Sequence, residues 1–158
     1  MQVAEIEPDT VVTLYDETSF KEAKSQPNAP WGLATLSSKR RNTGTYHYDK
    51  SAGNGTFAYV LDTGINVNHV DFEGRASFGY NAVDGEFADL NGHGTHCAGI
   101  IGSKSFGVAK QTQLIAVKVF SNHETLMSTV MDAYQWAAND IRTKQRVGLA
   151  VINMSLGR

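Results

Sequence analysis

The residues of this sequence best suited to chemistry lie in one segment, Asn91–Gly99 (NGHGTHCAG). Its histidine, His93, lies between two glycines, which let the backbone approach a neighbour closely and adopt dihedral angles closed to other residues. Small residues follow, as expected for a helix that packs tightly against another element. An imidazole at the start of such a helix suits acid–base chemistry, because its unperturbed pKa of roughly 6.5 lies near physiological pH.

A carboxylate upstream of this histidine is the second candidate. Asp62 ends the apolar run Phe57–Leu61 and is followed by the turn residue Gly64. Such runs are typical of buried parallel strands, and functional groups of open α/β sheets gather just beyond the carboxyl ends of their strands. Asp62 could therefore accept a hydrogen bond from the imidazole, fix its tautomer and stabilise its protonated form. The alternative is an aspartate that only caps the following turn.

The elements that must position these side chains are predicted from periodicity. Strands are expected over the apolar runs 56–61, 114–120 and 149–154. Helices are expected over 95–101 and from Thr125 or Ser128 to Thr143. The second helix is expected to bury one apolar stripe, made of Val130, Met131, Tyr134, Ala137, Ala138 and Ile141, with Trp136 also packed. Alternating strands and helices predict a three-layer α/β/α architecture with a mostly parallel sheet.

Composition excludes several classes of protein. The chain has 158 residues, 41% of them hydrophobic and 19% charged, which suits one modest domain. A formal net charge of −2 gives no electrostatic case for nucleic acid or an anionic membrane as a partner. No apolar stretch approaches the roughly 18 residues that a membrane span requires. The single cysteine, Cys97, excludes an internal disulfide and is either a nucleophile or a packing residue.

Taken together, these segments resemble the subtilisin-like serine proteases, above all the fungal secreted branch of proteinase K and the oryzin-type alkaline proteases. The likeness is carried, in order, by APWGL (29–33), YVLDTGIN (59–66), FEGRA (72–76), GHGTHCAG (92–99), GVAK (107–110) and INMSLG (152–157). The resemblance implies a subtilisin-like fold and a serine endopeptidase whose triad aspartate and histidine are Asp62 and His93. It also implies that His96 is structural and that Cys97 is a buried packing residue.

The resemblance further implies a substrate site and a missing nucleophile. Ser155, Leu156 and Gly157 would line the S1 pocket, and their backbone would pair with an extended protein or peptide substrate. The family's nucleophile motif, Gly-Thr-Ser-Met-Ala, does not occur here, nor does its oxyanion-hole asparagine. We therefore expect the N-terminal half of a catalytic domain, inactive alone, in which Ser155 is not the nucleophile. Residues 121–127 are bulkier than in relatives, so non-primed specificity is not implied.

The first 26 residues differ in character from the rest. They lack the basic region and apolar core of a signal peptide, and they resemble the tail of an inhibitory propeptide with its maturation linker. The alternative is an N-terminal β-arm. The catalytic part would then be 27–158, belonging to a secreted (alternatively vacuolar) monomer that its own propeptide inhibits. The family implies no cofactor for the chemistry and a structural calcium in the full-length enzyme.

Three other functions remain open from the residues. Asp62-Thr63-Gly64 after an apolar strand is also the signature of aspartic proteases, although a helix-rich second half does not suit their all-β lobes. A zinc site made of Asp62, His93 and His96 would want a further ligand at regular spacing, such as a His-Glu-x-x-His helix. The third is a non-catalytic fragment, which binds proteins or aggregates through the uncovered edge and face of the strands predicted over 114–120 and 149–154.

Overall fold

A computed structural model describes residues 22–40, 43–121 and 123–157. The propeptide-like segment predicted for the N-terminus lies largely outside these residues. The elements follow in the order β1 (Ala23–Pro27), α1 (Trp31–Leu36), β2 (Thr45–Asp49), β3 (Phe57–Asp62), the 3₁₀ helix η2 (Val70–Phe72), β4 (Ala76–Asn81), α2 (His93–Gly102), β5 (Gln113–Lys118), α3 (Met127–Thr143) and β6 (Ala150–Asn153).

The main sheet has four parallel strands in the order β4-β5-β3-β6. The central strand β3 pairs with β5 along its whole length, so that Asp62 lies opposite Lys118. On its other side β3 pairs with β6, from Phe57 opposite Ala150 to Val60 opposite Asn153. The parallel sheet predicted from the apolar runs is therefore confirmed.

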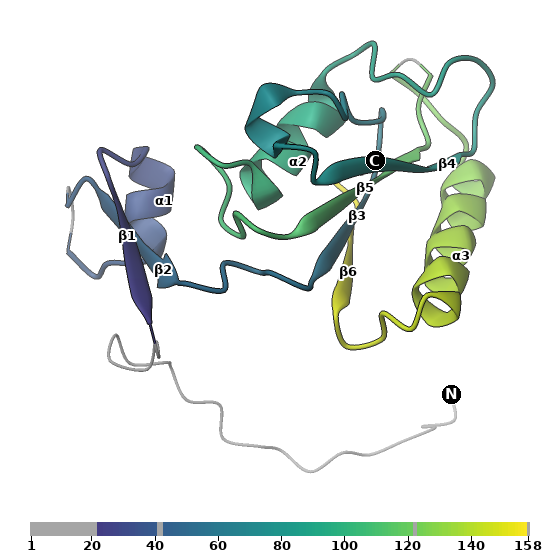
Figure 1. Cartoon of the computed structure of the whole chain (residues 1–158). Coiled ribbons are helices and arrows are strands. Elements are labelled where there is room, and N and C mark those ends of the chain that lie inside the picture. The colour runs from purple at the N-terminus through teal and green to yellow at the C-terminus, as the bar shows by residue number, and fades with distance from the viewer. Residues whose placement is uncertain (1–21, 41–42, 122, 158) are drawn as a thin grey trace, which may run out of the picture.

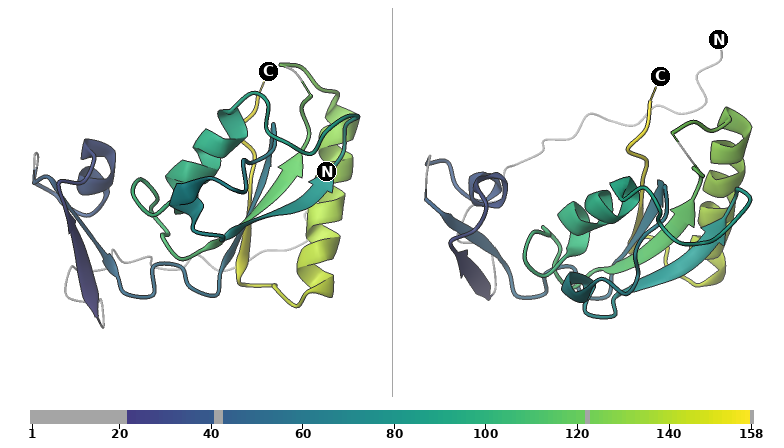
Figure 2. Two further views of the ribbon diagram at one scale, coloured as in Figure 1. Left: turned by 45° about the horizontal axis from the view of Figure 1, so that its top comes forward. Right: turned by 90° about the horizontal axis from the view of Figure 1, so that it is seen from above.

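Helices α2 and α3 cover opposite faces of this sheet (Figure 2). Ala58 and Val60 of β3 pack in the apolar cluster beneath α2, whereas Tyr59 and Leu61 pack in the cluster beneath α3. These layers confirm the predicted three-layer architecture. Because side chains alternate along a strand, Asp62 follows Val60 onto the α2 face of the sheet.

A small N-terminal unit made of β1, α1 and β2 lies beside the main sheet (Figure 1). Strands β1 and β2 are antiparallel, and Ala29, Leu33 and Tyr46 form a separate small core. The Tyr46 hydroxyl donates to the carbonyl oxygen of Val108 over 3.0 Å, and the Lys110 ammonium lies 5.5 Å from the Tyr46 ring centre. These contacts join the unit to the loop that leaves α2.

Strand β1 differs from the sequence-based prediction. The predicted maturation linker extended to Gln26, and no strand was expected there; residues 23–27 remain mostly exposed in the structure but pair with β2. Gln26 also donates through its side-chain amide to the carbonyl oxygen of Ser105, 3.0 Å away. Strands β1 and β2 are short and mostly polar, without a strong apolar alternation. Their pairing therefore could not be predicted from either segment alone.

The buried stripe of α3 was predicted only in part. Val130, Ala133 and Ala137 are buried, and Trp136 packs with them as expected. The packing predicted for Met131 and Tyr134 is wrong in this chain, because their exposures are 65% and 48%. Residues three and four apart share a helix face. The face that packs on the sheet is centred on Ala133 and Ala137, whereas the predicted stripe was centred on the next positions, Tyr134 and Ala138.

Strand β6 forms an edge of the described sheet, and part of its surface is uncovered. Val151 is 64% exposed, and its flanking residues Leu149 and Met154 are 49% and 44% exposed. The uncovered edge and face expected of both C-terminal strands are present at β6 but not at β5, which lies between β4 and β3 with residues 114–118 buried. No helix among the described residues is long and apolar enough to cross a membrane.

Candidate active site

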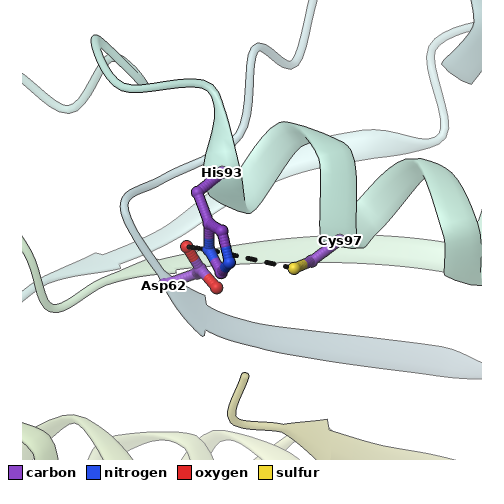
Figure 3. A group of neighbouring side chains, drawn as sticks. All are labelled: Asp62, His93 and Cys97. Atoms are coloured by element: carbon purple, nitrogen blue, oxygen red, sulfur yellow. Dashed lines mark hydrogen bonds and ion pairs between the residues drawn. The ribbon is translucent and has the colours of Figure 1, made fainter. Parts of the chain in front are cut away.

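Asp62 and His93 meet where the end of β3 faces the start of α2 (Figure 3). The Nδ1 atom of His93 lies 2.8 Å from the Oδ1 atom of Asp62. The carboxylate side chain is only 2% exposed, whereas the imidazole side chain is 52% exposed. The hydrogen bond predicted from the two motifs is thus present between a buried acceptor and a ring open to solvent.

This contact determines which ring nitrogen is free. A carboxylate can only accept, so the Nδ1 atom of His93 carries the hydrogen that it donates to Asp62. In the neutral ring the Nε2 atom is then an acceptor. Asp62 also accepts the backbone N–H of Thr63 over 2.7 Å, which holds the carboxylate in place. The pair therefore presents an oriented base on the exposed side of the ring.

The two glycines of the histidine motif have different structural roles. Gly92, which precedes α2, has φ of 95°, in the left-handed region that favours glycine. Gly94 presses on the β3 strand end, since a Cβ atom there would overlap the carbonyl oxygen of Gly64 and lie 3.0 Å from the Cβ of Asp62. The short distance between helix and strand therefore requires Gly94, whereas Gly92 is required by its backbone conformation.

Cys97 lies one helical turn after His93, with its sulfur 3.9 Å from His93 Nδ1 (Figure 3). Burial, and to a lesser degree the charge of Asp62, raise the pKa of its thiol against an opposing hydrogen bond with Ser155. The thiol also faces the ring nitrogen that Asp62 already occupies. Both observations favour a packing residue over a nucleophile.

The ligand-type atoms of Asp62, His93 and Cys97 lie within 4.8 Å of one another, but they do not form a calcium site. Calcium takes six to eight oxygen ligands, whereas this set offers a single carboxylate oxygen beside one nitrogen and one sulfur. His96 does not belong to this cluster and is exposed on α2. The structural calcium of the full-length enzyme stays a prediction.

The predicted substrate residues follow β6 as an irregular segment. Ser155 and Gly157 are exposed, and Leu156 is half-buried against the α3-side cluster. The Ser155 hydroxyl accepts a hydrogen bond from the side-chain amide of Asn153 over 3.0 Å. Strands β3 and β6 run parallel, so the segment after β6 and the Asp62 side chain both lie at the carboxyl ends of their strands. The structure therefore gathers the catalytic candidates and the substrate candidates at one end of the sheet.

Two polar residues near the pair were missed by sequence analysis. Asp89, in the loop before α2, binds the first turn of α2 and the hydroxyl of Thr63. Lys118 is 3% exposed, and its ammonium donates to the carbonyl oxygens of Thr63 and Ala88 at 2.7 and 3.1 Å. An aspartate shortly before a helix start is a capping signal that could have identified Asp89. Lys118, inside an apolar strand, had no such signal.

A family profile, known protein sequences and solved structures all relate this chain to the same kind of protein. The profile of the Subtilase family (peptidase S8) matches residues 53–158. Alkaline protease 1 from Aspergillus clavatus is 52% identical over 98% of this chain and 37% of its own length. Alkaline proteinase from Hapsidospora chrysogena is 50% identical over 98% of this chain and 40% of its own length. A solved cold-adapted subtilisin-like serine proteinase is 38% identical, with a TM-score of 0.70, over 83% of this chain and 47% of that one. The chain spans less than half the length of each.

Proposed function

The chain belongs to the Subtilase family, and on that premise we propose that it supplies the general base and its orienting carboxylate to a serine endopeptidase. The observation that carries the proposal is the hydrogen bond of 2.8 Å between His93 and the buried Asp62. A buried carboxylate under a half-exposed imidazole is the arrangement that activates a serine hydroxyl in such enzymes.

The proposed chemistry is acyl transfer in two proton steps. The Nε2 atom of His93 takes the proton of a serine hydroxyl as the serine oxygen attacks a peptide carbonyl. The imidazolium then returns that proton to the leaving amine, while Asp62 stabilises the transient positive charge. The serine, and a side-chain donor for the oxyanion, come from a polypeptide segment outside these 158 residues.

Protein and peptide substrates are proposed to bind along the segment after β6. Ser155 and Gly157 are exposed there, and β6 pairs with β3 on one side only among the described residues. An extended peptide can add to such an edge through backbone hydrogen bonds, which every sequence offers. Broad specificity follows from this mode of binding.

A secreted enzyme made as a zymogen is the proposed context, with a vacuolar enzyme as the alternative. The relatives that support it are fungal alkaline proteases matched over almost the whole chain. We place the boundary between propeptide and catalytic part before β1 rather than at residue 27, because residues 23–27 pair with β2. A monomer inhibited by its own propeptide completes the proposal.

A second candidate function applies to the chain in isolation. The exposed apolar side chains Leu149, Val151 and Met154 surround the edge strand β6. An uncovered apolar edge pairs readily with other chains, so the isolated chain could bind proteins or self-associate. An aspartic protease is disfavoured, because Asp62 ends a parallel strand between two helices rather than a strand of an all-β lobe.

The test uses a fluorophosphonate probe, which labels an activated serine. We compare the 158-residue chain with an extended enzyme, in which this chain is followed by the remaining C-terminal sequence of the Aspergillus clavatus relative. The isolated chain should not be labelled, whereas the extended enzyme should be labelled and should hydrolyse peptides. Asp62→Asn should lower its kcat by about four orders of magnitude, and His93→Ala by about six.

The matched control is His47→Ala, which removes an exposed histidine of β2. It should leave labelling and hydrolysis unchanged. The proposal would be contradicted by a folded extended enzyme whose rate does not depend on His93. Labelling of the isolated chain that disappears in His93→Ala would instead make a serine of this chain, such as Ser155, the nucleophile.

A further inference from the structure

We propose that Asp89 is a positioning residue for the Asp62–His93 pair and joins the two chain segments that carry these side chains. The inference rests on the proposed function only in the role given to that pair. Asp89 lies near the end of the loop before α2 and is half-buried. Its Oδ1 atom accepts three hydrogen bonds and its Oδ2 atom two. The donors come from both segments.

The segment after Asp62 is held through one hydroxyl group. Thr63 donates its hydroxyl hydrogen to Asp89 Oδ1 over 2.8 Å, and the same hydroxyl oxygen accepts the backbone N–H of Gly94 at 3.0 Å. Thr63 and Gly94 are the immediate sequence neighbours of the two candidate catalytic residues. These two hydrogen bonds therefore connect strand end and helix directly beside the pair.

The first turn of α2 is held by the remaining bonds. The backbone N–H groups of Asn91 and Gly92 donate to Oδ1 over 3.1 and 2.8 Å. Thr95 donates its backbone N–H and its hydroxyl to Oδ2 over 3.0 and 2.5 Å. The hydroxyl oxygen of Thr95 in turn accepts the backbone N–H of Asn66 at 2.9 Å, which gives a second link to the loop after β3. The histidine lies between these fixed points.

The charge of Asp89 strengthens this arrangement. Burial disfavours its ionised form, but hydrogen bonds from Thr95, Gly92 and Thr63 outweigh burial and hold the pKa of Asp89 below its usual range. Hydrogen bonds to an ionised acceptor are stronger than those between neutral groups. A negative charge is also favourable at the N-terminus of a helix. The carboxylate thus stays ionised and keeps both segments bound at neutral pH.

An ordinary helix cap would explain only part of this network. It would account for the bonds to Gly92 and Thr95, which belong to the start of α2. It would not require the bond to Thr63, which lies on the other segment and stabilises no helix. The role of Asp89 in positioning can therefore be separated from its role as a cap by removing the Thr63 hydroxyl alone.

The experiment uses proton NMR of the 158-residue chain, observing the Nδ1–H hydrogen of His93 in its bond to Asp62. Asp89→Asn and Thr63→Val should shift this resonance upfield and speed its exchange with water at least about tenfold, because the bond loosens. Thr63→Val changes no charge and leaves the Asn91, Gly92 and Thr95 bonds to Asp89 in place. Thr63→Ser, which keeps the hydroxyl, should restore the wild-type resonance.

A kinetic measurement on the extended enzyme adds a second readout. Asp89→Asn and Thr63→Val should lower kcat about tenfold to a hundredfold, since small displacements of a catalytic group have effects of this size. KM should change less than about twofold, because neither side chain is assigned to substrate binding. Asp84→Asn is the matched control, since it neutralises an exposed aspartate of the same loop.

The outcomes separate this inference from the proposed function. If both variants lower stability but leave the His93 resonance and its exchange unchanged, Asp89 is only a helix cap and the inference is overturned. If Asp89→Asn does not fold, Thr63→Val decides, because it retains the cap. A changed resonance in a chain whose extended enzyme shows no hydrolysis would support the positioning role and refute the proposed function.

Discussion

Each of the two helices that cover β3 is held at one end by an aspartate. The aspartate lies at the start of α2 and near the end of α3, and the two carboxylates have different hydrogen-bond and ion-pair partners. Asp89 binds the first turn of α2 through backbone N–H groups and hydroxyls. Asp140, near the end of α3, lies 2.8 Å from the Lys144 ammonium and 3.5 Å from the Arg146 guanidinium. The Tyr59 hydroxyl also donates to Asp140, over 2.6 Å.

The difference follows what each helix has to do. Helix α2 carries an imidazole that must face one carboxylate, and neutral donors on the backbone give Asp89 a fixed geometry. Helix α3 only has to cover the apolar side of β3, and long charged side chains suffice to hold its end. A carboxylate is favoured at a helix N-terminus and disfavoured at a C-terminus, so Asp140 needs its cations whereas Asp89 does not.

The largest effect is expected from forcing α2 away from β3. Gly94→Ala would place a methyl group against the carbonyl oxygen of Gly64 and 3.0 Å from the Cβ of Asp62. We expect a loss of about 3 kcal/mol in the free energy of unfolding and loss of the His93 Nδ1–H resonance. Urea unfolding and proton NMR measure the two effects.

A glycine on the open side of the same helix is the control. A Cβ atom at Gly99 would meet nothing within 4 Å. Gly99→Ala should therefore raise stability by about 0.5 kcal/mol or more, because alanine favours the helix over glycine. Equal effects of the two substitutions would show that helix α2 is not tightly apposed to the strand.

An intermediate effect is expected at the end of α3. Tyr59→Phe removes a hydroxyl that donates to Asp140 and accepts from Arg146 over 2.7 Å. We expect a loss of about 1 kcal/mol in the free energy of unfolding, with the His93 resonance unchanged, because this anchor faces the other side of the sheet. The Tyr80 hydroxyl donates to Asp132, which is exposed, so Tyr80→Phe should lower the free energy of unfolding by less than Tyr59→Phe does.

The smallest effects are those of pH and salt on the two aspartates. The pKa of Asp89 and the pKa of Asp140 are both lowered, because hydrogen bonds to each carboxylate outweigh the effect of its burial. A carboxyl group whose pKa is lower in the folded state stabilises the fold above its unfolded pKa of about 3.9. This stabilisation is lost as the pH falls through the folded value. Urea midpoints of wild type, Asp89→Asn and Asp140→Asn should therefore converge below about pH 4.

Salt should distinguish the two carboxylates at neutral pH. The partners of Asp140 include Lys144 and Arg146, and ion pairs near the surface are weakened by screening. The destabilisation by Asp140→Asn should therefore shrink when sodium chloride is added. That of Asp89→Asn should stay constant, because its donors are neutral; a parallel decline would contradict the contrast drawn between the two anchors.

Much of the fold could be predicted because its signals are local. The apolar runs that form β3 and β5 and the Gly-rich start of α2 are strong over short windows. The observed boundaries of these elements differ from the predicted ones by only one or two residues; α2, for example, begins at His93 instead of the predicted Thr95. Strand β1 could not be predicted in this way, since its pairing depends on β2, a separate polar segment.

Local sequence patterns identify the groups that can do chemistry, namely a histidine between glycines and a carboxylate at a strand end, and they show that the nucleophile motif is missing. Which of these groups meet depends on the folded arrangement of the elements. Asp62 reaches His93 because strand alternation directs it to the α2 side of the sheet and Gly94 permits close contact. Asp89 is selected from a run of loop residues because its carboxylate lies between two segments distant in sequence. Such contacts depend on register and packing, which no short window of residues contains.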